Sequence, residues 1–270
     1  MATRYSVANG NWNATSTWSA SSGGSSGASV PATGDRAIIE GGFTVTLTGD
    51  TTTGGCDIDG GGSAGTLVGG GYTLTCDGDG SGTTFDHDGN ISGHLDVVLN
   101  GAADNTSRNL DLGGGGTQIR NLTCNNANTT WTLINNAVSL TGNLTITAGT
   151  LDTGSDIALT VTGLCKVYGT LTGNSSTITV GALHLDGGTY SAPDSSGSTI
   201  INDESGNQAF DNDGTFTHNG GTVTITTAGN SQIDWIGTGS GNLNNLTYSG
   251  GAILEWTVNG GTIDGNLNIT

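Results

Sequence analysis

The chain has 270 residues, of which 50 are glycine and 2 are proline, and apolar residues alternate with threonine along much of its length. Collagen is excluded because there is no Gly-X-Y period, and the alternation argues against disorder. The formal net charge is −18, from 23 acidic and 5 basic residues. We expect neither nucleic acid binding nor membrane insertion, since phosphate binding needs clustered Lys and Arg and a spanning helix needs about 18 consecutive apolar residues.

Residues 1–42 differ in composition from the rest of the chain. They contain Trp12 and Trp18, two of the five tryptophans, and a stretch rich in Gly and Ser at 20–29. A stacked β structure must cover its first coil, because an open end exposes core side chains and unpaired strand edges. The sequence therefore predicts an N-terminal cap over residues 1–42.

From residue 43 onward, short runs of β-branched and apolar residues recur between Gly, Asn and Asp. This period-2 pattern is typical of half-buried strands, and no helical period competes with it. The triplet GTL occurs at 149–151 and again at 169–171, and this interval indicates the length of one coil. The runs are FTVTL (43–47), YTLTC (72–76), LDVVL (95–99), WTLI (131–134), NLTIT (143–147), ALTVT (158–162), TITV (177–180), LHL (183–185), TVTIT (222–226) and ILEWTV (253–258).

An internal repeat of about 125 residues organises this part, because residues 85–147 recur as residues 210–270. FDHDGN returns as FDNDGT, and NLTC returns as NLTY. Self-similarity of this kind indicates stacked equivalent units. Trp131 and Trp256 occupy equivalent places in the two copies, and each shares a strand face with an apolar neighbour. We expect both to be core anchors.

The predicted fold is all-β: a right-handed parallel β-solenoid over residues 43–270, with roughly ten coils stacked at about 4.8 Å. Antiparallel β-sandwich repeats are the alternative. A sandwich favours two-residue Asn-Gly hairpin turns at each reversal. Many breaks here are longer, such as 48–55 and 77–84, so the solenoid is preferred.

The N-terminal part also resembles a known group of proteins. GNWNATSTWS (10–19) followed by VPATGDRAIIEGGFTVTL (30–47) is similar to a motif that opens many β-helical surface proteins of bacteria and virion structural proteins of tailed phages. LHLDGGTYSAP (183–193), AFDNDGTFTHNGGTVTI (209–225) and NLTYSGG (245–251) resemble coils of the same proteins. The resemblance implies a β-helix in an adhesive or structural setting, and it brings no catalytic residues.

One stretch has the spacing of a calcium loop. In DGDGSGTTFDHD, Asp77, Asp79 and Ser81 occupy positions 1, 3 and 5, the Thr83 carbonyl occupies position 7, and Asp88 occupies position 12. The flanking helices of an EF-hand are missing, and Asp88 replaces the usual Glu. Calcium is therefore the one candidate cofactor, against the alternative of a solvated acidic turn with no cofactor.

The four cysteines are not placed like the disulfide framework of a small secreted domain. Cys76 and Cys124 each follow a Leu by two residues, on the same strand face, which indicates small buried hydrophobes. The interval between Cys56 and Cys76 matches one coil, so a bond between them is an alternative. We expect free buried thiols at all four positions, Cys165 included.

Enzymatic signatures are weak. Sugar cleavage needs two carboxylates, one protonated and one ionised, and Glu occurs only as Glu40, Glu204 and Glu255. Most Asp residues lie in Gly-rich turns, where ordinary pKa values are expected. The histidines lack metal-ligand spacing, His184 is expected to be a surface residue, and no nucleophile elbow or Walker loop is present. We therefore expect no enzyme.

Thr-x-Thr pairs are a further recurring feature, and such pairs are typical of flat ice-binding faces. An ice-binding face needs the pairs in one column on coils of uniform length. Because these coils vary in length, we expect the threonines to be ordinary outward strand residues. The pairs are Thr44/Thr46, Thr145/Thr147, Thr160/Thr162, Thr177/Thr179 and Thr222/Thr224.

The expected function is a non-enzymatic structural or adhesive part of a phage virion: a tail fibre, a spike, or a capsid decoration or head fibre. The N-terminus lacks an export signal, so we expect assembly in the host cytoplasm and a virion location after lysis. A bacterial cell-surface adhesin or exported filament is the first alternative, and a tailspike polysaccharide depolymerase is the second.

The expected partners are other virion proteins, a host-surface glycan or protein, and further copies of this chain, with a trimer favoured. Weak contacts multiplied over many copies would give useful avidity. Thr270 aligns with Thr147 of the first repeat, and no capping sequence follows it. We expect either a longer native chain or a partner that covers this end.

Overall fold

The computed structural model describes residues 1–80, 82–101, 107–113, 118–203, 208–235, 241–250, 253–258 and 261–270. The chain divides into two compact units, Met1–Thr141 (unit 1) and Gly142–Thr270 (unit 2). In these described ranges, every regular element except one 3₁₀ turn is a β-strand. Among the same residues, no helix has the length and apolar character needed to cross a membrane.

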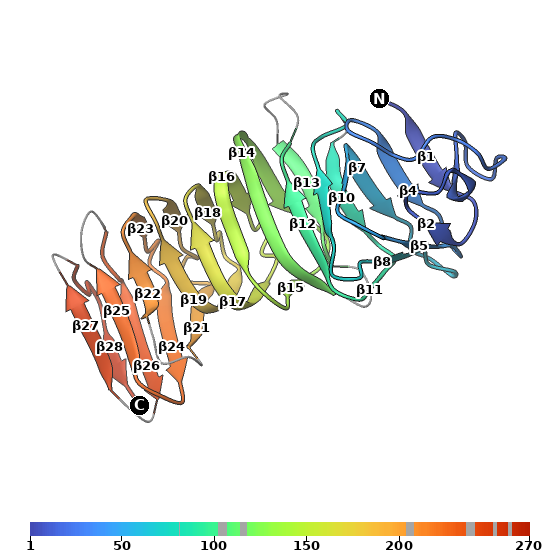
Figure 1. Ribbon diagram of the computed structural model, residues 1–270. Helices are drawn as coiled ribbons and strands as arrows, with labels where there is room; N and C mark the ends of the chain where they lie inside the picture. Colours follow the sequence, from blue (N-terminus) through green and yellow to red (C-terminus); the bar gives the residue numbers. More distant parts are fainter. Residues whose placement is uncertain are drawn as a thin grey trace. The chain divides into compact units, whose positions relative to one another are not determined.

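Unit 1 contains fifteen strands and the 3₁₀ turn within its described residues (Figure 1). They are β1 (Thr3–Ser6), β2 (Gly10–Asn11), η1 (Thr15–Thr17), β3 (Trp18–Ser19), β4 (Arg36–Ile39), β5 (Thr44–Thr46), β6 (Thr51–Thr53), β7 (Gly55–Ile58), β8 (Thr66–Val68), β9 (Thr73–Cys76), β10 (Thr83–His87), β11 (Asn90–Ser92), β12 (Leu95–Leu99), β13 (Ser107–Asp111), β14 (Ile119–Leu133) and β15 (Val138–Leu140).

Within the described residues of unit 2, every regular element is a β-strand. They are β16 (Leu144–Asp152), β17 (Leu159–Val167), β18 (Thr170–Thr172), β19 (Thr177–Leu185), β20 (Thr189–Ser191), β21 (Ser198–Asp203), β22 (Gln208–Asn212), β23 (Thr215–Thr217), β24 (Thr222–Thr227), β25 (Ser231–Trp235), β26 (Asn245–Gly250), β27 (Leu254–Val258) and β28 (Leu267–Ile269).

The strands stack in parallel, coil upon coil. In unit 1, β4, β7, β10 and β13 lie side by side (Figure 1), and Ala37, Cys56, Phe85 and Leu110 are successive partners in this stack. Among the paired strands of the described part, only β1 with β3 is antiparallel. The predicted parallel β-solenoid is therefore confirmed, with about nine turns instead of the roughly ten expected, and the sandwich alternative is wrong.

Coil length varies more than the sequence predicted. In unit 2, Cys165 of β17 pairs with Leu183 of β19, and Leu183 pairs in turn with Phe210 of β22, so the second of these coils is much longer than the first. The turns between strands take up the extra residues. Strand register is kept because a slip of one residue would move every apolar side chain from the core to the surface.

The core lies inside each coil, where every second strand residue is buried. β12 has the pattern buried, half-buried, buried, half-buried, buried, with Leu95, Val97 and Leu99 inward. Burial of such a side chain stabilises the fold by about 1.5–3 kcal/mol. Trp131 is fully buried, as predicted, whereas Trp256 is half-buried.

All four cysteines are free and buried, which confirms the prediction of unpaired thiols. Burial raises the pKa of the Cys56 thiol, with Cys76 adding to the shift, and burial alone raises the pKa of Cys165 to about 12. A thiol with so high a pKa holds little thiolate and is a poor nucleophile. These cysteines therefore act as small apolar core residues.

The two N-terminal tryptophans pack as a pair at the start of unit 1. Their ring centroids lie 5.1 Å apart in an edge-to-face arrangement, and the Trp18 indole N–H donates to the Trp12 carbonyl at 2.7 Å. The predicted boundary at residue 42 stays a prediction. Within it, β1 and β4 already pair in parallel, and β4 pairs with β7, so this segment also contributes strands to the coil stack.

Candidate functional site

Three aspartates form a ladder on the side of unit 1 that faces away from its core; Asp57 and Asp86 are half-buried and Asp111 is fully buried. Asp57 on β7, Asp86 on β10 and Asp111 on β13 are direct partners in successive coils. They point away from the core because their strand neighbours Cys56, Phe85 and Leu110 point inward. Parallel strands lie about 4.8 Å apart, so three negative charges are stacked at close spacing.

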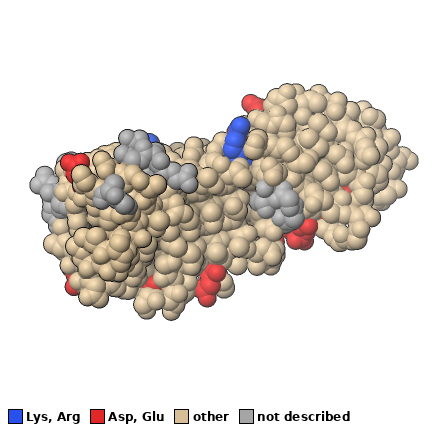
Figure 2. Space-filling model, turned by 90° about the horizontal axis from the view of Figure 1, so that it is seen from below, with Lys and Arg blue, Asp and Glu red and all other residues tan. Residues whose placement is uncertain are grey.

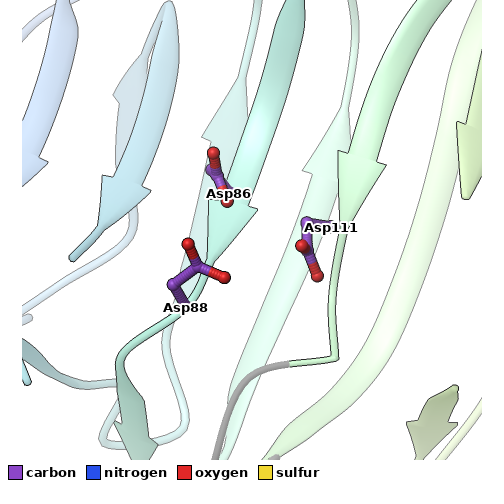
Figure 3. Close-up of side chains that lie close together, drawn as sticks. All are labelled: Asp86, Asp88 and Asp111. Atoms are coloured by element: carbon purple, nitrogen blue, oxygen red, sulfur yellow. The ribbon is translucent and has the colours of Figure 1, made fainter. Parts of the chain in front are cut away.

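Asp88, just after β10, joins the last two members of this ladder. Figure 3 shows Asp86, Asp88 and Asp111 turned toward a common space, and one carboxylate oxygen from each lies within 4.8 Å of the others. Calcium binds oxygen ligands at about 2.3–2.6 Å, so oxygens on opposite sides of one ion are about 5 Å apart. One divalent cation could contact all three carboxylates.

The electrostatics of the ladder disfavour full ionisation. Burial, reinforced by Asp57, Asp88 and Asp111, raises the pKa of Asp86 to about 6. Burial also raises the pKa of Asp57, although Arg36 opposes the shift. At neutral pH the folded protein therefore keeps Asp86 charged at a cost in stability, which a bound cation or proton would relieve.

Donors reach the ladder only at its ends. At one end, Arg36 contacts Asp57 at 3.3 Å. At the other, the Asp111 carboxylate accepts hydrogen bonds from the backbone N–H of Gly113 at 3.1 Å and from the Asn135 amide at 2.5 Å. No hydrogen bond to the Asp86 carboxylate, in the middle, is made by any residue that the structure describes.

The predicted calcium loop does not gather around one point. Asp79 accepts a hydrogen bond from Arg36 at 3.0 Å, and the Thr83 carbonyl accepts another from the same guanidinium at 3.0 Å. Asp77 accepts the backbone N–H of Gly34 at 3.1 Å.

The remaining two residues of the predicted loop are Asp88 and Ser81. Asp88 belongs to the cluster with Asp86 and Asp111, and Ser81 lies outside the described residues. A guanidinium thus occupies the space that the loop spacing assigned to a cation. Sequence spacing missed this because Arg36 is distant from Asp79 along the chain and reaches it only through coil stacking.

An open hollow of about 620 Å³ lies beside this cluster. It is lined by Asp59 and Asp88 and by three glycines, Gly41, Gly60 and Gly61. Burial, with Asp57, Glu40 and Asp88 adding to it, raises the pKa of Asp59. The hollow is therefore polar, acidic and open to solvent, which suits a cation or a hydrated ligand more than an apolar molecule.

Unit 2 has a mixed version of the same ladder. Its successive partners are Lys166, His184, Asp211 and Asp234. Burial raises the pKa of Asp211, while His184 opposes that shift. Asp234 accepts a hydrogen bond from the Gln208 amide at 2.9 Å. Basic and amide groups therefore relieve in unit 2 the repulsion that unit 1 leaves in place.

The sequence contains a signal for both ladders that the strand pattern alone did not reveal. A charged residue between two inward residues recurs as CDI (56–58), FDH (85–87) and LDL (110–112) in unit 1, and as LHL (183–185) and FDN (210–212) in unit 2. His184, predicted to be a surface residue, is half-buried, and its Nε2 lies 3.2 Å from the Gln208 carbonyl.

The fold and this surface define a class: a parallel β-solenoid with a charged ladder along its outside. On the face in Figure 2, acidic side chains form separate small patches, although the net charge is −18. Comparison with protein-family models, with curated proteins and with solved structures gives no match.

Proposed function

We propose that this chain is a non-enzymatic structural and adhesive component of a phage particle, as a tail fibre, a spike, or a capsid decoration or head fibre. It contacts the host surface, and its partners are other virion proteins, a host glycan or protein, and copies of itself, most simply as a trimer. The location that follows is the virion, with the bacterial cell surface as the alternative.

The observation that carries this proposal is the structural role of the N-terminal motif, which resembles the opening of virion and adhesin β-helices. Trp12 and Trp18 form the buried pair at the start of unit 1. Gly34 takes a positive φ of 76°, and the Asp35 carboxylate accepts the backbone N–H of Ala2 at 2.7 Å. The motif residues thus begin the coil stack, which supports a shared architecture with those proteins.

The surface chemistry supports attachment by many weak contacts. Parallel coils repeat similar outward side chains at a spacing of about 4.8 Å, so one chain presents several equivalent contact points. A net charge of −18 keeps neighbouring copies apart and soluble. Multiple copies on one particle would convert weak contacts into avidity.

Mass spectrometry of purified phage particles tests the proposal. Peptides of this chain should be present in particles whose genome carries its coding sequence, at a copy number matching a structural protein. The purified chain should also bind intact host cells. Absence from the particles, with presence on the bacterial envelope, would replace the proposal with the surface-adhesin alternative.

A tailspike depolymerase is the second candidate, and Asp86 is the observation that favours it. A carboxyl with a pKa of about 6 can act as a general acid at neutral pH, and Asp88 and Asp111 lie beside it. Incubation with host capsular polysaccharide measures this activity. Release of new reducing ends, lost in Asp86→Asn and Asp111→Asn, would support the enzyme and contradict the non-enzymatic proposal.

A further inference from the structure

A second surface, on unit 2, has a more regular chemistry than the acidic ladder. The segment Thr150–Asp152 at the end of β16 is followed in the stack by the short strands β18, β20 and β23 (Figure 1). We call the outward side of these four segments the hydroxyl face. Its sequences are TLD, TLT, TYS and TFT.

The face contains two columns in register. The first column is threonine in all four coils: Thr150, Thr170, Thr189 and Thr215 are successive partners. The second column, two residues further along each strand, is Asp152, Thr172, Ser191 and Thr217. Neighbouring positions are about 4.8 Å apart across the strands and about 6.6 Å apart along them.

The backing of the hydroxyl face is rigid. The residue between the two columns points inward in every coil, and all four such residues are at most 2 % exposed. Threonine is β-branched, so its χ1 angle has little freedom on a strand. The hydroxyl and methyl groups therefore keep nearly fixed positions. The inward residues are Leu151, Leu171, Tyr190 and Phe216.

Glycines just before β18, β20 and β23 bring three of the four coils close to the coil before. Each threonine of the first column follows a glycine, and a Cβ on Gly169, Gly188 or Gly214 would lie 2.1–2.5 Å from a backbone carbonyl oxygen of the coil before. Only glycine permits so close an approach of two coils. The corner before the face is therefore tight in the three coils that contain Gly169, Gly188 and Gly214.

Three of the four threonines in the first column have a side-chain hydroxyl that can bind a partner. Within the described part of the chain, Thr150, Thr170 and Thr189 make no side-chain hydrogen bond, and each of these residues is partly exposed to solvent. Asp152 is the one charged residue on the four segments, and it lies at the edge of the face, where the Asn174 amide donates to it at 2.7 Å.

The scarcity of charge on the hydroxyl face indicates which kind of partner it suits. The chain carries a net charge of −18, yet seven of the eight positions in the two columns are Thr or Ser, and Asp152 is the one acidic residue. Charged groups hold water in radial shells, whereas fixed hydroxyls of constant spacing hold it in a lattice. A partner with its own repeating lattice of hydroxyls or water matches this surface better than an irregular one.

We infer that the hydroxyl face of unit 2 binds the surface of ice. The Thr-x-Thr pairs named from the sequence do not form this face. Thr160, Thr179, Thr224 and Thr247 lie in another column, which Ile200 interrupts. Uniform coil length is not needed for such a column, because the turns take up the extra residues and the four segments stay in register. The same differences in coil length hid the column in the sequence.

Thermal hysteresis and ice recrystallisation of the full chain test the inference. The wild-type protein should slow recrystallisation and separate the melting and freezing points. Thr189→Lys and Thr172→Lys, which place a long charged side chain on the hydroxyl face, should reduce both effects to the level of buffer. Thr179→Lys, an outward threonine on the interrupted column, is the matched control and should retain them.

Circular dichroism and thermal unfolding of each variant confirm that the fold is kept. The inference is overturned if the wild-type chain leaves ice growth unchanged at all concentrations, or if Thr179→Lys loses as much activity as Thr189→Lys. Binding to microcrystalline cellulose or chitin without any effect on ice would also overturn it, and would assign the face to a neutral polysaccharide.

Discussion

Strand β10 in unit 1 and strand β22 in unit 2 have the same sequence of buried and half-buried positions, yet one inward position differs chemically. His87 fills it in unit 1 and Asn212 in unit 2, and both are fully buried. The Asn212 side-chain oxygen Oδ1 accepts a hydrogen bond from the backbone N–H of Gly214 at 3.1 Å. Neither His87 ring nitrogen makes a hydrogen bond of standard geometry within the described part.

The outer ladders show the same contrast: the polar groups have fewer partners in unit 1 than in unit 2. In unit 1, Asp57, Asp86 and Asp111 stack without a cation between them, whereas in unit 2 Asp211 has His184 as its ladder neighbour. Copying a coil preserves its inward-outward pattern, because that pattern sets the register. The polar chemistry at each position is free to diverge. At these two equivalent positions, unit 1 has the polar groups that cost stability, and unit 2 has groups with a partner.

The core of unit 2 gives the largest expected difference. Phe210 packs edge-to-face on Phe216 at 5.5 Å and on Trp235 at 5.2 Å. Phe210→Ala should lower the free energy of unfolding by about 3–5 kcal/mol, from lost burial and the cavity left behind. Phe85→Ala, at the equivalent position, should cost less, since its one ring neighbour is His87 at 6.5 Å. Urea unfolding measures both, and equal losses would contradict the comparison.

The next largest loss of stability is expected at the glycines that precede the hydroxyl face. A Cβ at position 188 would lie 2.3 Å from the Val167 carbonyl oxygen, so Gly188→Ala must push two coils apart. We expect a loss of about 1–3 kcal/mol in the free energy of unfolding. Gly229→Ala is the control, because nothing lies within 4 Å of its Cβ position. A similar loss in both variants would show that the close stacking is not the cause.

For the acidic ladder, we predict that removing one charge increases the stability of the fold. The raised pKa of Asp86 means that its charged form is disfavoured in the folded state, so Asp86→Asn should stabilise the protein at pH 7 by about 1 kcal/mol after solvent screening. Asp211→Asn should gain less, because His184 already opposes the repulsion there.

Thermal unfolding with added calcium tests whether the ladder also binds a cation. If Asp86, Asp88 and Asp111 hold a cation, added calcium should raise the unfolding temperature of the wild type and leave Asp86→Asn little changed. A wild type that does not respond would remove the calcium prediction and leave the charge repulsion standing. Destabilisation by Asp86→Asn without calcium would contradict the ladder itself.

His87 predicts the smallest effect, and it depends on pH. Burial lowers its pKa, against smaller opposing contributions from the Leu112 backbone, Asp111 and Asp88. The unfolded chain therefore binds a proton first, near pH 6.5, and stability falls as pH decreases from there toward the folded pKa.

The variant His87→Asn isolates this effect. It should lose less stability than the wild type between pH 7 and pH 5, by about 1 kcal/mol per pH unit at most. Asn212→His should introduce the same sensitivity into unit 2. The ladder acts in the opposite sense, because the pKa of Asp86 is raised to about 6 and its protonation stabilises the fold as pH falls. Urea midpoints at both pH values separate the two, and identical pH profiles for His87→Asn and wild type would contradict the assignment.

Sequence patterns predicted features that depend on neighbouring residues along the chain. Strand alternation and the free buried cysteines are both local in this sense, and both are confirmed. The site was not predictable in the same way. Asp57, Asp86 and Asp111 are ladder partners although a whole coil of chain separates each from the next.

The difference has a physical reason. Turn length does not alter inward-outward alternation, but it decides which residues of successive coils become neighbours. Arg36 reaches Asp79 only across two coils, and the interval along the chain between successive threonines of the hydroxyl face differs from coil to coil. Such contacts can be recognised only after the coils are aligned in space.

Parallel in-register stacking is the claim on which all these contacts depend, and engineered cross-links measure it directly. Thr170 and Thr189 are partners in adjacent coils, so Thr170→Cys with Thr189→Cys places the Cα atoms about 4.8 Å apart, within disulfide range. Thr170→Cys with Ser191→Cys is offset by two residues and lies beyond about 7 Å, out of reach. We predict rapid oxidation of the first pair and none of the second. Equal oxidation of both pairs, or of the second alone, would contradict the stacking.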